Sequence, residues 1–138
     1  MTTQFLHQGS AALREIAPVK NTKFQKPEGG LWLTPEDGIS FYEFLGRDET
    51  PESFTLDVSD RNILVVDLMG FFKADNRYSY TFIGGIAGDR PGKMHKRWDW
   101  EKLAEDYDGV YFTEEVLELC ECNCPLYSVD FPSLLLFR

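Results

Sequence analysis

The sequence predicts an α+β fold, and three observations carry this prediction. Short apolar or alternating runs of the kind found in strands recur along the chain, whereas apolar residues at helical spacing occur in only a few segments. The two kinds of segment do not alternate regularly, as a parallel βαβ series requires. We therefore expect at least five short strands with two or three helices in a single domain over residues 1–138.

Turn and cap residues set the limits of the elements in the N-terminal half. Gly9-Ser10 ends the first apolar run, and Ser10 is suited to cap a helix that Pro18 prevents from extending far. The Gly29-Gly30 pair ends a polar stretch that is suited to cover a ligand, and Pro35 begins a helical turn. The elements predicted here are a strand over residues 4–7, a helix over 11–16, a loop over 19–30, a strand over 31–34 and a helix over 35–45.

Strand-like runs also dominate the middle and the C-terminal part of the chain. Residues 54–58 alternate like a half-buried strand, and residues 62–68 form a continuous apolar run like a central one. Glycines surround the aromatic stretch 78–83, which predicts a strand between loops. The remaining predictions are a helix over residues 98–107, a strand over 110–113 and a final strand over 133–137.

Composition narrows the classes of function. The 23 acidic and 14 basic side chains give a net charge of -9, which repels nucleic-acid backbones and anionic lipid surfaces. No run approaches the roughly 20 apolar residues of a membrane span, and the N-terminus does not look like a secretion signal. We expect a cytoplasmic protein that binds neither membranes nor nucleic acid directly, with reduced thiols at Cys120, Cys122 and Cys124.

A histidine followed by glycine and serine, a glycine-rich second strand and a later tyrosine form an ordered set: His7 to Ser10, Gly29 to Thr34, and Tyr42. Taken alone, His7 is equally a half-buried strand residue bonded to backbone. The ordered set resembles the ADP-ribosyltransferase superfamily, in the branch related to diphtheria toxin and the poly-ADP-ribose polymerases. This resemblance implies a compact, split antiparallel or mixed sheet and NAD as the substrate.

The resemblance also implies which residues contact NAD. His7 bonds the adenosine-side ribose or backbone, Gly9 of the Gly9-Ser10 pair contacts the nicotinamide carboxamide, and Tyr42 stacks on the nicotinamide ring. Gln8 separates His7 from Gly9, whereas the family has these two residues adjacent. In the second strand, Trp32 either flanks the ligand or belongs to the core, with the core preferred, and Thr34 either bonds a ribose or caps the following turn, with the cap preferred.

The third element that the resemblance implies is a carboxylate at the head of a late strand. It stabilises the positive charge that develops on the ribose as nicotinamide leaves. Asp130 is the first choice, because the Tyr107-Asp108-Gly109-Val110 segment is similar to one that precedes this acid in phage and bacterial members. Glu114 and Glu115 are the second choice.

These residues predict an enzyme that transfers ADP-ribose to a macromolecular target, expected to be a protein. A toxin, an effector or a phage-encoded inhibitor fits this compactness. Hydrolysis of NAD is an alternative, and so is a non-catalytic acidic protein, such as a phage anti-defence inhibitor, that blocks a partner by binding. The basic run 93–97 is either a phosphate site or a solvated loop, with the loop preferred. A zinc site formed by the three cysteines with His95 is disfavoured by their alternate spacing.

Overall fold

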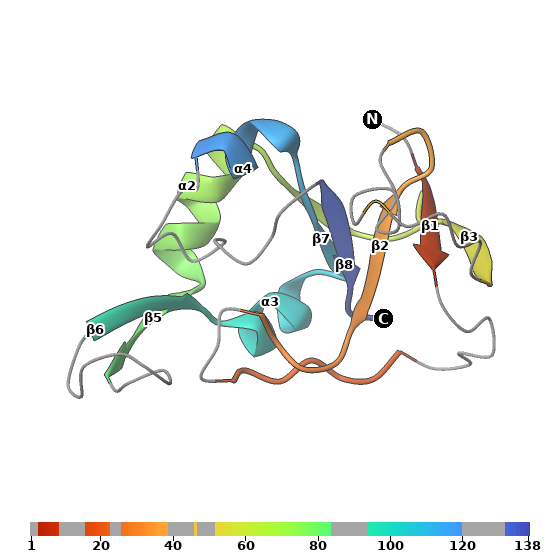
Figure 1. The fold of residues 1–138 in the computed structure, drawn as a ribbon. Coiled ribbons are helices and arrows are strands. Elements are labelled where there is room, and N and C mark those ends of the chain that lie inside the picture. Colours follow the sequence, from red (N-terminus) through yellow and green to blue (C-terminus); the bar gives the residue numbers. More distant parts are fainter. Residues whose placement is uncertain are drawn as a thin grey trace.

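Strands from both ends of the chain meet in one six-stranded sheet, with a separate two-stranded ribbon beside it (Figure 1). The computed structural model describes residues 3–8, 16–22, 26–38, 46, 52–83, 94–119 and 132–138. The strands of the large sheet, in spatial order, are β3 (Ser53–Asp57), β1 (Gln4–Gln8), β2 (Leu31–Pro35), β8 (Ser133–Leu136), β7 (Gly109–Phe112) and β4 (Ile63–Val66). The ribbon pairs β5 (Ser79–Ile83) with β6 (Met94–Trp98), and the helices are α2 (Leu68–Arg77), α3 (Trp100–Asp106) and α4 (Glu114–Leu119).

The large sheet is mixed. Among the described strands, β4 and β7 form the one parallel pair, and the other neighbours run antiparallel. A parallel pair needs a long crossover connection, and here the connection contains α2, the ribbon and α3. The predicted α+β class is confirmed, and the described part of the chain holds three helices.

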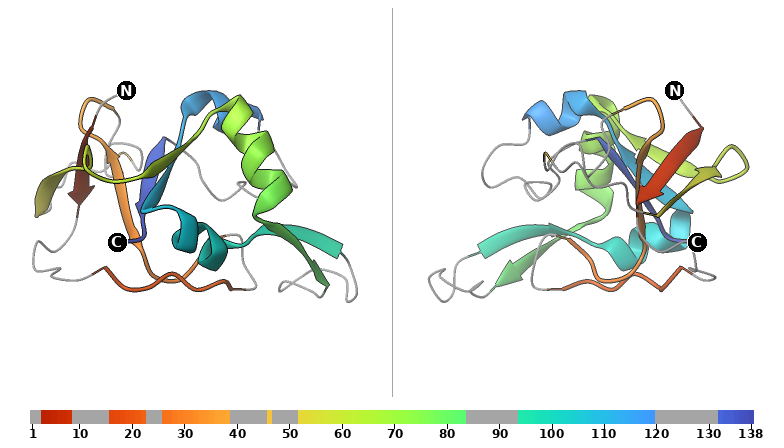
Figure 2. Two further views of the ribbon diagram at one scale, coloured as in Figure 1. Left: turned by 180° about the vertical axis from the view of Figure 1, so that it is seen from behind. Right: turned by 45° about the vertical axis from the view of Figure 1, so that its right-hand side comes forward.

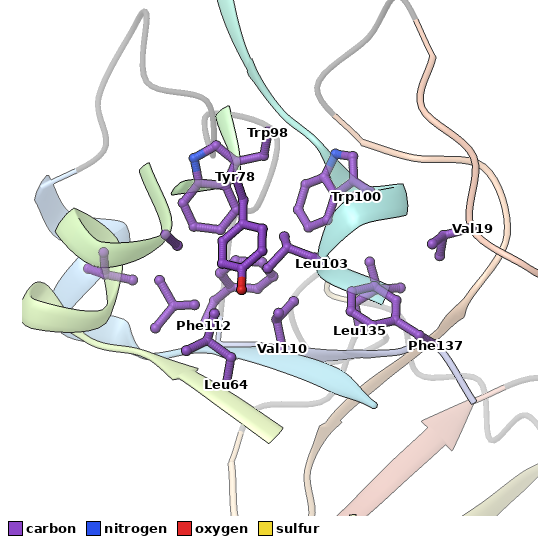
Figure 3. Packing of buried hydrophobic residues seen from close by; sticks show 13 residues of the cluster. Val19, Leu64, Tyr78, Trp98, Trp100, Leu103, Val110, Phe112, Leu135 and Phe137 are labelled. Atoms are coloured by element: carbon purple, nitrogen blue, oxygen red, sulfur yellow. The ribbon is translucent and has the colours of Figure 1, made fainter. Parts of the chain in front are cut away.

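The helices pack on one side of the sheet, as the two further views make clear (Figure 2). The larger core lies between them and the sheet, and Figure 3 shows its aromatic centre. Trp98 lies 5.8 Å from Trp100 and 6.2 Å from Phe112 between ring centroids. We call this the helix-side core; its buried members are Val19, Leu64, Val66, Ala74, Tyr78, Trp98, Trp100, Leu103, Val110, Phe112, Val116, Leu135 and Phe137.

A smaller core covers the other side of the sheet. Strand β8 contributes to both cores because neighbouring side chains on a strand point to opposite faces: Leu135 lies in the helix-side core, whereas Leu134 and Leu136 lie in the smaller one. Burial of the whole strand explains why its sequence is a continuous apolar run. We call the second cluster the far-side core; its buried members are Phe5, Leu31, Leu33, Val58, Leu134 and Leu136.

Three elements were not predicted from the sequence: helix α2, strand β6 and helix α4. Residues 68–77, expected to lead into a loop, form helix α2, which begins where the Asp67 carboxylate accepts a 2.8 Å hydrogen bond from the Gly70 backbone N–H. A Cβ at position 70 would lie 2.3 Å from the Val65 carbonyl oxygen, so glycine permits this tight entry. The basic run 93–97, interpreted as a solvated loop or phosphate site, mostly falls in strand β6, where Arg97 is 4% exposed.

The central position expected for residues 62–68 was wrong, because strand β4 lies at one edge of the large sheet and β3 lies at the other. The bounds of all seven predicted strands are confirmed within one or two residues. They are β1, β2, β3, β4, β5, β7 and β8. The predicted helix over 98–107 is shorter, because β6 extends to Trp98 and Asp99 caps α3. The helices predicted over 11–16 and 35–45 fall largely outside the described residues, as do the three cysteines. In the described part of the chain, every helix is too short or too polar to cross a membrane.

Candidate functional site

His7 lies where the pairing between β1 and β2 ends. Strand β1 pairs with β3 at five positions but with β2 at only two, and the second of these joins Leu6 to Thr34. At the next residue a side chain replaces the backbone ladder: the His7 ring, through Nδ1, makes a 2.9 Å hydrogen bond with the Trp32 carbonyl oxygen. The imidazole therefore connects two strands at the point where they separate.

This hydrogen bond fixes the tautomer of His7. A carbonyl oxygen only accepts hydrogen bonds, so Nδ1 must carry the proton and donate it. In the neutral ring Nε2 is then an acceptor. The Phe54 ring from β3 packs against the imidazole, with ring centroids 5.2 Å apart and planes inclined by 40°. The ring is thus held between β2 and β3 with a nitrogen lone pair suited to a ligand hydroxyl.

Trp32 combines the two interpretations that its sequence left open. Its ring stacks on Phe112 of the helix-side core, with centroids 6.4 Å apart and an interplanar angle of 26°. On the indole, the Lys26 Nζ lies 5.5 Å from the ring centroid. Trp32 is half-buried overall. One part of the indole therefore belongs to the core, while another is covered by an exposed cationic side chain from the 19–30 loop.

Thr34 does not cap the turn that follows β2. That turn is closed by a backbone hydrogen bond from Gly38 to Pro35, whereas the Thr34 hydroxyl has no partner in the part of the chain that the structure describes. Thr34 is only 6% exposed. The preference for a capping role was therefore wrong, because the strand geometry turns this side chain inward, away from the turn it precedes.

The predicted ligand contacts in the described region fall on two faces of the sheet. Trp32 packs on the helix-side core, and Thr34, two residues along the same strand, shares its face. Phe54, the ring neighbour of His7, packs on the far-side core. The structure therefore brings His7 to Trp32 through the Trp32 backbone rather than its side chain. Three further predicted contacts, Gly9, Ser10 and Tyr42, lie outside the described residues.

Of the three predicted acids, the structure describes two. Asp130 lies outside the described residues, whereas Glu114 and Glu115 are exposed in the first turn of α4. The negative charges of Asp37 and Glu114 act on Tyr111 of β7. Burial first, and then the negative charges of Asp37 and Glu114, raise the pKa of the Tyr111 hydroxyl. Among the predicted acids that the structure describes, Glu114 is thus the one whose charge acts on the hydroxyl of Tyr111.

Tyr111 and Asp37 were missed from the sequence. Tyr111 packs against the far-side core, edge-on to Phe5 with ring centroids 5.5 Å apart, and His7 follows Phe5 two residues along β1. Tyr111 and His7 therefore lie on the same face of the sheet. Tyr111 alternates in sequence with the buried residues Val110 and Phe112, and this pattern was the available sign that it faces the opposite side.

An open acidic depression lies at the start of α3. Its volume is roughly 360 Å³, and it is lined by Asn21, Asp99, Glu101, Lys102 and Glu105. Asn21 ties the 19–30 loop to this helix, because its Nδ2 donates to Asp99 over 2.9 Å and its Oδ1 accepts from the Trp100 backbone over 2.8 Å. Within the described ranges, no three histidine, cysteine, aspartate or glutamate residues are grouped to hold a metal ion.

In comparisons with protein-family models, curated proteins and solved structures, the chain matches none of them.

Proposed function

We propose that this chain binds NAD beside His7 and transfers its ADP-ribose to a protein, with release of nicotinamide. The proposal begins from the ordered set of residues around His7, Gly30 and Tyr42 in the sequence. The observation that carries it is the hydrogen bond from His7 Nδ1 to the Trp32 carbonyl. This bond holds Nε2 as an acceptor at the end of the β1–β2 ladder, where a ribose hydroxyl of NAD donates to it.

The chemistry requires little covalent participation from the protein. The bond between ribose C1′ and the nicotinamide nitrogen breaks, and nicotinamide leaves as a neutral molecule with the electron pair of that bond. A nucleophile of the target attacks C1′ and loses its proton to solvent. A carboxylate stabilises the positive charge that develops on the ribose. Asp130 is the first candidate for this role, and Glu114 is the candidate supported by its position near Tyr111.

Nicotinamide release tests the proposal directly. The purified chain is incubated with NAD, nicotinamide is measured by chromatography, and NAD binding is measured as a shift in melting temperature. His7→Ala should abolish the thermal shift and lower the release rate at least about tenfold, which corresponds to one strong hydrogen bond in the transition state. His95→Ala, which changes the other histidine of the chain on β6, is the matched control. Absence of both release and thermal shift in the unchanged protein would exclude the proposal.

The acid is identified by conservative amide substitutions. Asp130→Asn and Glu114→Gln remove one negative charge each and keep the shape of the side chain. The substitution at the charge-stabilising position should lower nicotinamide release by about 10²-fold or more while the NAD-dependent thermal shift remains. Glu115→Gln tests the other second-choice acid, and Glu118→Gln is the control, because Glu118 is an exposed glutamate of the same helix with no proposed role. Product analysis without a protein target separates transfer from hydrolysis, since only hydrolysis yields free ADP-ribose there.

A second candidate function is a non-catalytic acidic protein that blocks a partner by binding. The acidic depression around Asp99, Glu101 and Glu105 favours it, since an open, negatively charged surface suits a basic protein segment. Under this alternative NAD produces no thermal shift. The double substitution Glu101→Lys with Glu105→Lys then weakens capture of a basic peptide, whereas His7→Ala leaves capture unchanged.

A further inference from the structure

Trp32 and Lys26 together present an aromatic ring and a cation at one place on the surface. The Lys26 ammonium lies 5.5 Å from the centroid of the Trp32 ring, and the lysine is exposed. We propose that this pair, here called the Trp32–Lys26 platform, binds the ADP half of the substrate: adenine stacks on the indole and the diphosphate binds the ammonium. This inference rests on the proposed function, because it names a subsite for NAD that the sequence resemblance does not supply.

The indole is rigid enough to serve as a stacking surface. It packs against Phe112, which is fully buried, with ring centroids 6.4 Å apart and planes inclined by 26°. Its backbone belongs to β2 and pairs with Leu135 of β8 in the middle of the sheet. A ring fixed in this way loses little conformational entropy when a planar base stacks on it. Such stacking accepts any nucleobase, because every base has a π face.

The cation is carried by a loop that is tied down at several points. Lys20 and Glu28 exchange two backbone hydrogen bonds of 3.0 Å, and the Thr22 hydroxyl donates to the Lys26 carbonyl over 3.0 Å. Asn21 attaches the same loop to the start of α3. The Lys26 backbone is therefore held, while its long side chain is free to rotate off the indole and follow a phosphate without a change of the loop.

The loop that carries Lys26 is itself basic, although Asn21 of this loop contacts the acidic residues Asp99 and Glu101. Residues 19–30 contain three lysines and one glutamate, which gives this segment a charge of +2 within a chain of -9. A local positive potential attracts phosphate and is screened beyond about 8 Å at physiological ionic strength. The phosphate attraction should therefore be confined to the platform and weaken as salt is added.

The platform and His7 meet at one residue. Trp32 presents its ring to Lys26 and its carbonyl oxygen to His7, but the indole and the imidazole belong to different faces of the sheet. Only a ligand that passes β2 at the point where β1 no longer pairs with it contacts both groups. A dinucleotide has this length, so we expect NAD to bind more tightly than ADP.

Calorimetric titration with ADP tests the platform on the complete chain. In the unchanged protein ADP should bind more tightly than adenosine or pyrophosphate, since each of these contacts one part of the platform. Lys26→Ala should weaken ADP binding about tenfold, the amount expected for one charge-assisted hydrogen bond, and should leave adenosine binding unchanged. Lys26→Arg should restore ADP binding. Lys20→Ala is the control, because Lys20 is an exposed lysine of the same loop.

Substitutions of Trp32 test the stacking part. Trp32→Leu should remove adenosine and ADP binding, whereas Trp32→Phe should keep most of it, because a smaller aromatic ring still stacks on Phe112. Trp32→Phe also serves if Trp32→Leu does not fold. Failure of ADP to bind the unchanged protein, or equal weakening by Lys20→Ala and Lys26→Ala, would overturn the inference.

The outcome for the platform is separable from the outcome for the proposed function. ADP binding that depends on Lys26, with no release of nicotinamide from NAD, would support the nucleotide site and reject the transferase. Nicotinamide release that is unchanged in Lys26→Ala, at NAD concentrations well below saturation, would reject the platform and keep the transferase.

Discussion

The Tyr78 hydroxyl donates a 2.6 Å hydrogen bond to Oδ2 of Asp106, which joins the C-terminal ends of α2 and α3 across the helix-side core. Tyr78 is 2% exposed, and its ring meets Tyr107 edge-on with centroids 6.2 Å apart. Burial, followed by the hydrogen bond and the negative charge of Asp106, raises the pKa of Tyr78 from 10.0 to about 12. The two helices are thus connected by a phenol that stays protonated well into the alkaline range.

Removal of the Tyr78 hydroxyl should change the free energy of unfolding and the dependence of this free energy on pH. Tyr78→Phe should lower the free energy of unfolding at pH 7 by about 1–1.5 kcal/mol, the usual net value of one buried hydrogen bond. The folded protein holds the Tyr78 proton more tightly than the unfolded chain, so this stabilisation is complete below pH 10 and is lost as the pH rises through about 12. Urea unfolding between pH 7 and pH 11 should show a smaller alkaline loss in Tyr78→Phe than in the unchanged protein.

Asp108 should produce the opposite pH dependence. Its carboxylate accepts hydrogen bonds of 2.8 Å from the Asn62 backbone N–H and the Arg138 Nε, and these groups lower its pKa below 3.8. Its contribution to stability is therefore present above pH 3.8, and it is lost as the pH falls through the lowered pKa of Asp108 in the folded protein. Asp108→Asn should reduce the free energy of unfolding at pH 7 by about 1–3 kcal/mol, with a smaller difference at pH 3.

Asp60 is the matched control for this substitution. Its carboxylate lies 3.7 Å from Arg61, but its side chain is 83% exposed, so solvent screens the pair. Asp60→Asn should change the free energy of unfolding by less than about 0.5 kcal/mol at either pH. An equal effect of the two substitutions would show that the hydrogen bonds of Asp108 contribute nothing beyond its charge.

Alanine substitutions at Gly29 and Gly46 distinguish the energetic cost of backbone strain from that of a steric clash. Both have positive φ, at +76° and +68°. A Cβ at position 29 would lie 2.2 Å from the Pro18 carbonyl oxygen, whereas one at position 46 meets nothing within 4 Å in the part of the chain that the structure describes. Gly46→Ala should cost about 1–2 kcal/mol from the left-handed backbone alone. Gly29→Ala should cost at least about 3 kcal/mol, because displacement of backbone adds to this strain. Thermal unfolding of the two variants measures the difference.

The attachment of the 19–30 loop to α3 should depend on Asn21. Asn21→Ala removes the hydrogen bonds to Asp99 and to the Trp100 backbone, and should lower the free energy of unfolding by about 1–2 kcal/mol. Amide hydrogen exchange should become faster at Lys20 and Glu28, whose backbone pair closes the loop. Asn76→Ala, at an exposed position of α2, should leave exchange in the loop unchanged. The backbone N–H of residue 21 still donates to Glu101 in this variant, so unaltered exchange would mean that the loop is held without the Asn21 side chain.

The fold was predictable where local pattern and burial agree. The continuous apolar run that became β8 lies inside the sheet, where both faces of the strand are covered, so the sequence reflects burial on two sides. Helix α2 was missed because Gly70 and its neighbouring aromatic residues are poor helix signals. Its start depends on the Asp67 cap and on packing of Phe71 against Trp98, with ring centroids 5.8 Å apart. Tertiary contacts therefore outweighed local propensity.

The candidate site was predictable in part for the same reason. The sequence singled out His7 and Trp32 individually, but no local pattern shows that a His7 side chain meets a Trp32 carbonyl 25 residues away. Tyr111 and Asp37 were missed because their proximity depends on the order of strands in the sheet. The role of Lys26 was missed because a lysine in a polar loop carries no local sign of what its side chain will contact.

The sequence by itself determined the α+β class, the positions of most strands and the histidine on which the proposed function depends. These properties follow from hydrophobic periodicity and turn residues, which act over a few neighbouring positions. Tertiary structure decided which side chains share a face, which nitrogen of His7 carries its proton and which cation covers Trp32. Such relationships arise from strand order and register, which bring together residues far apart in the chain, and they set the chemistry of the candidate site.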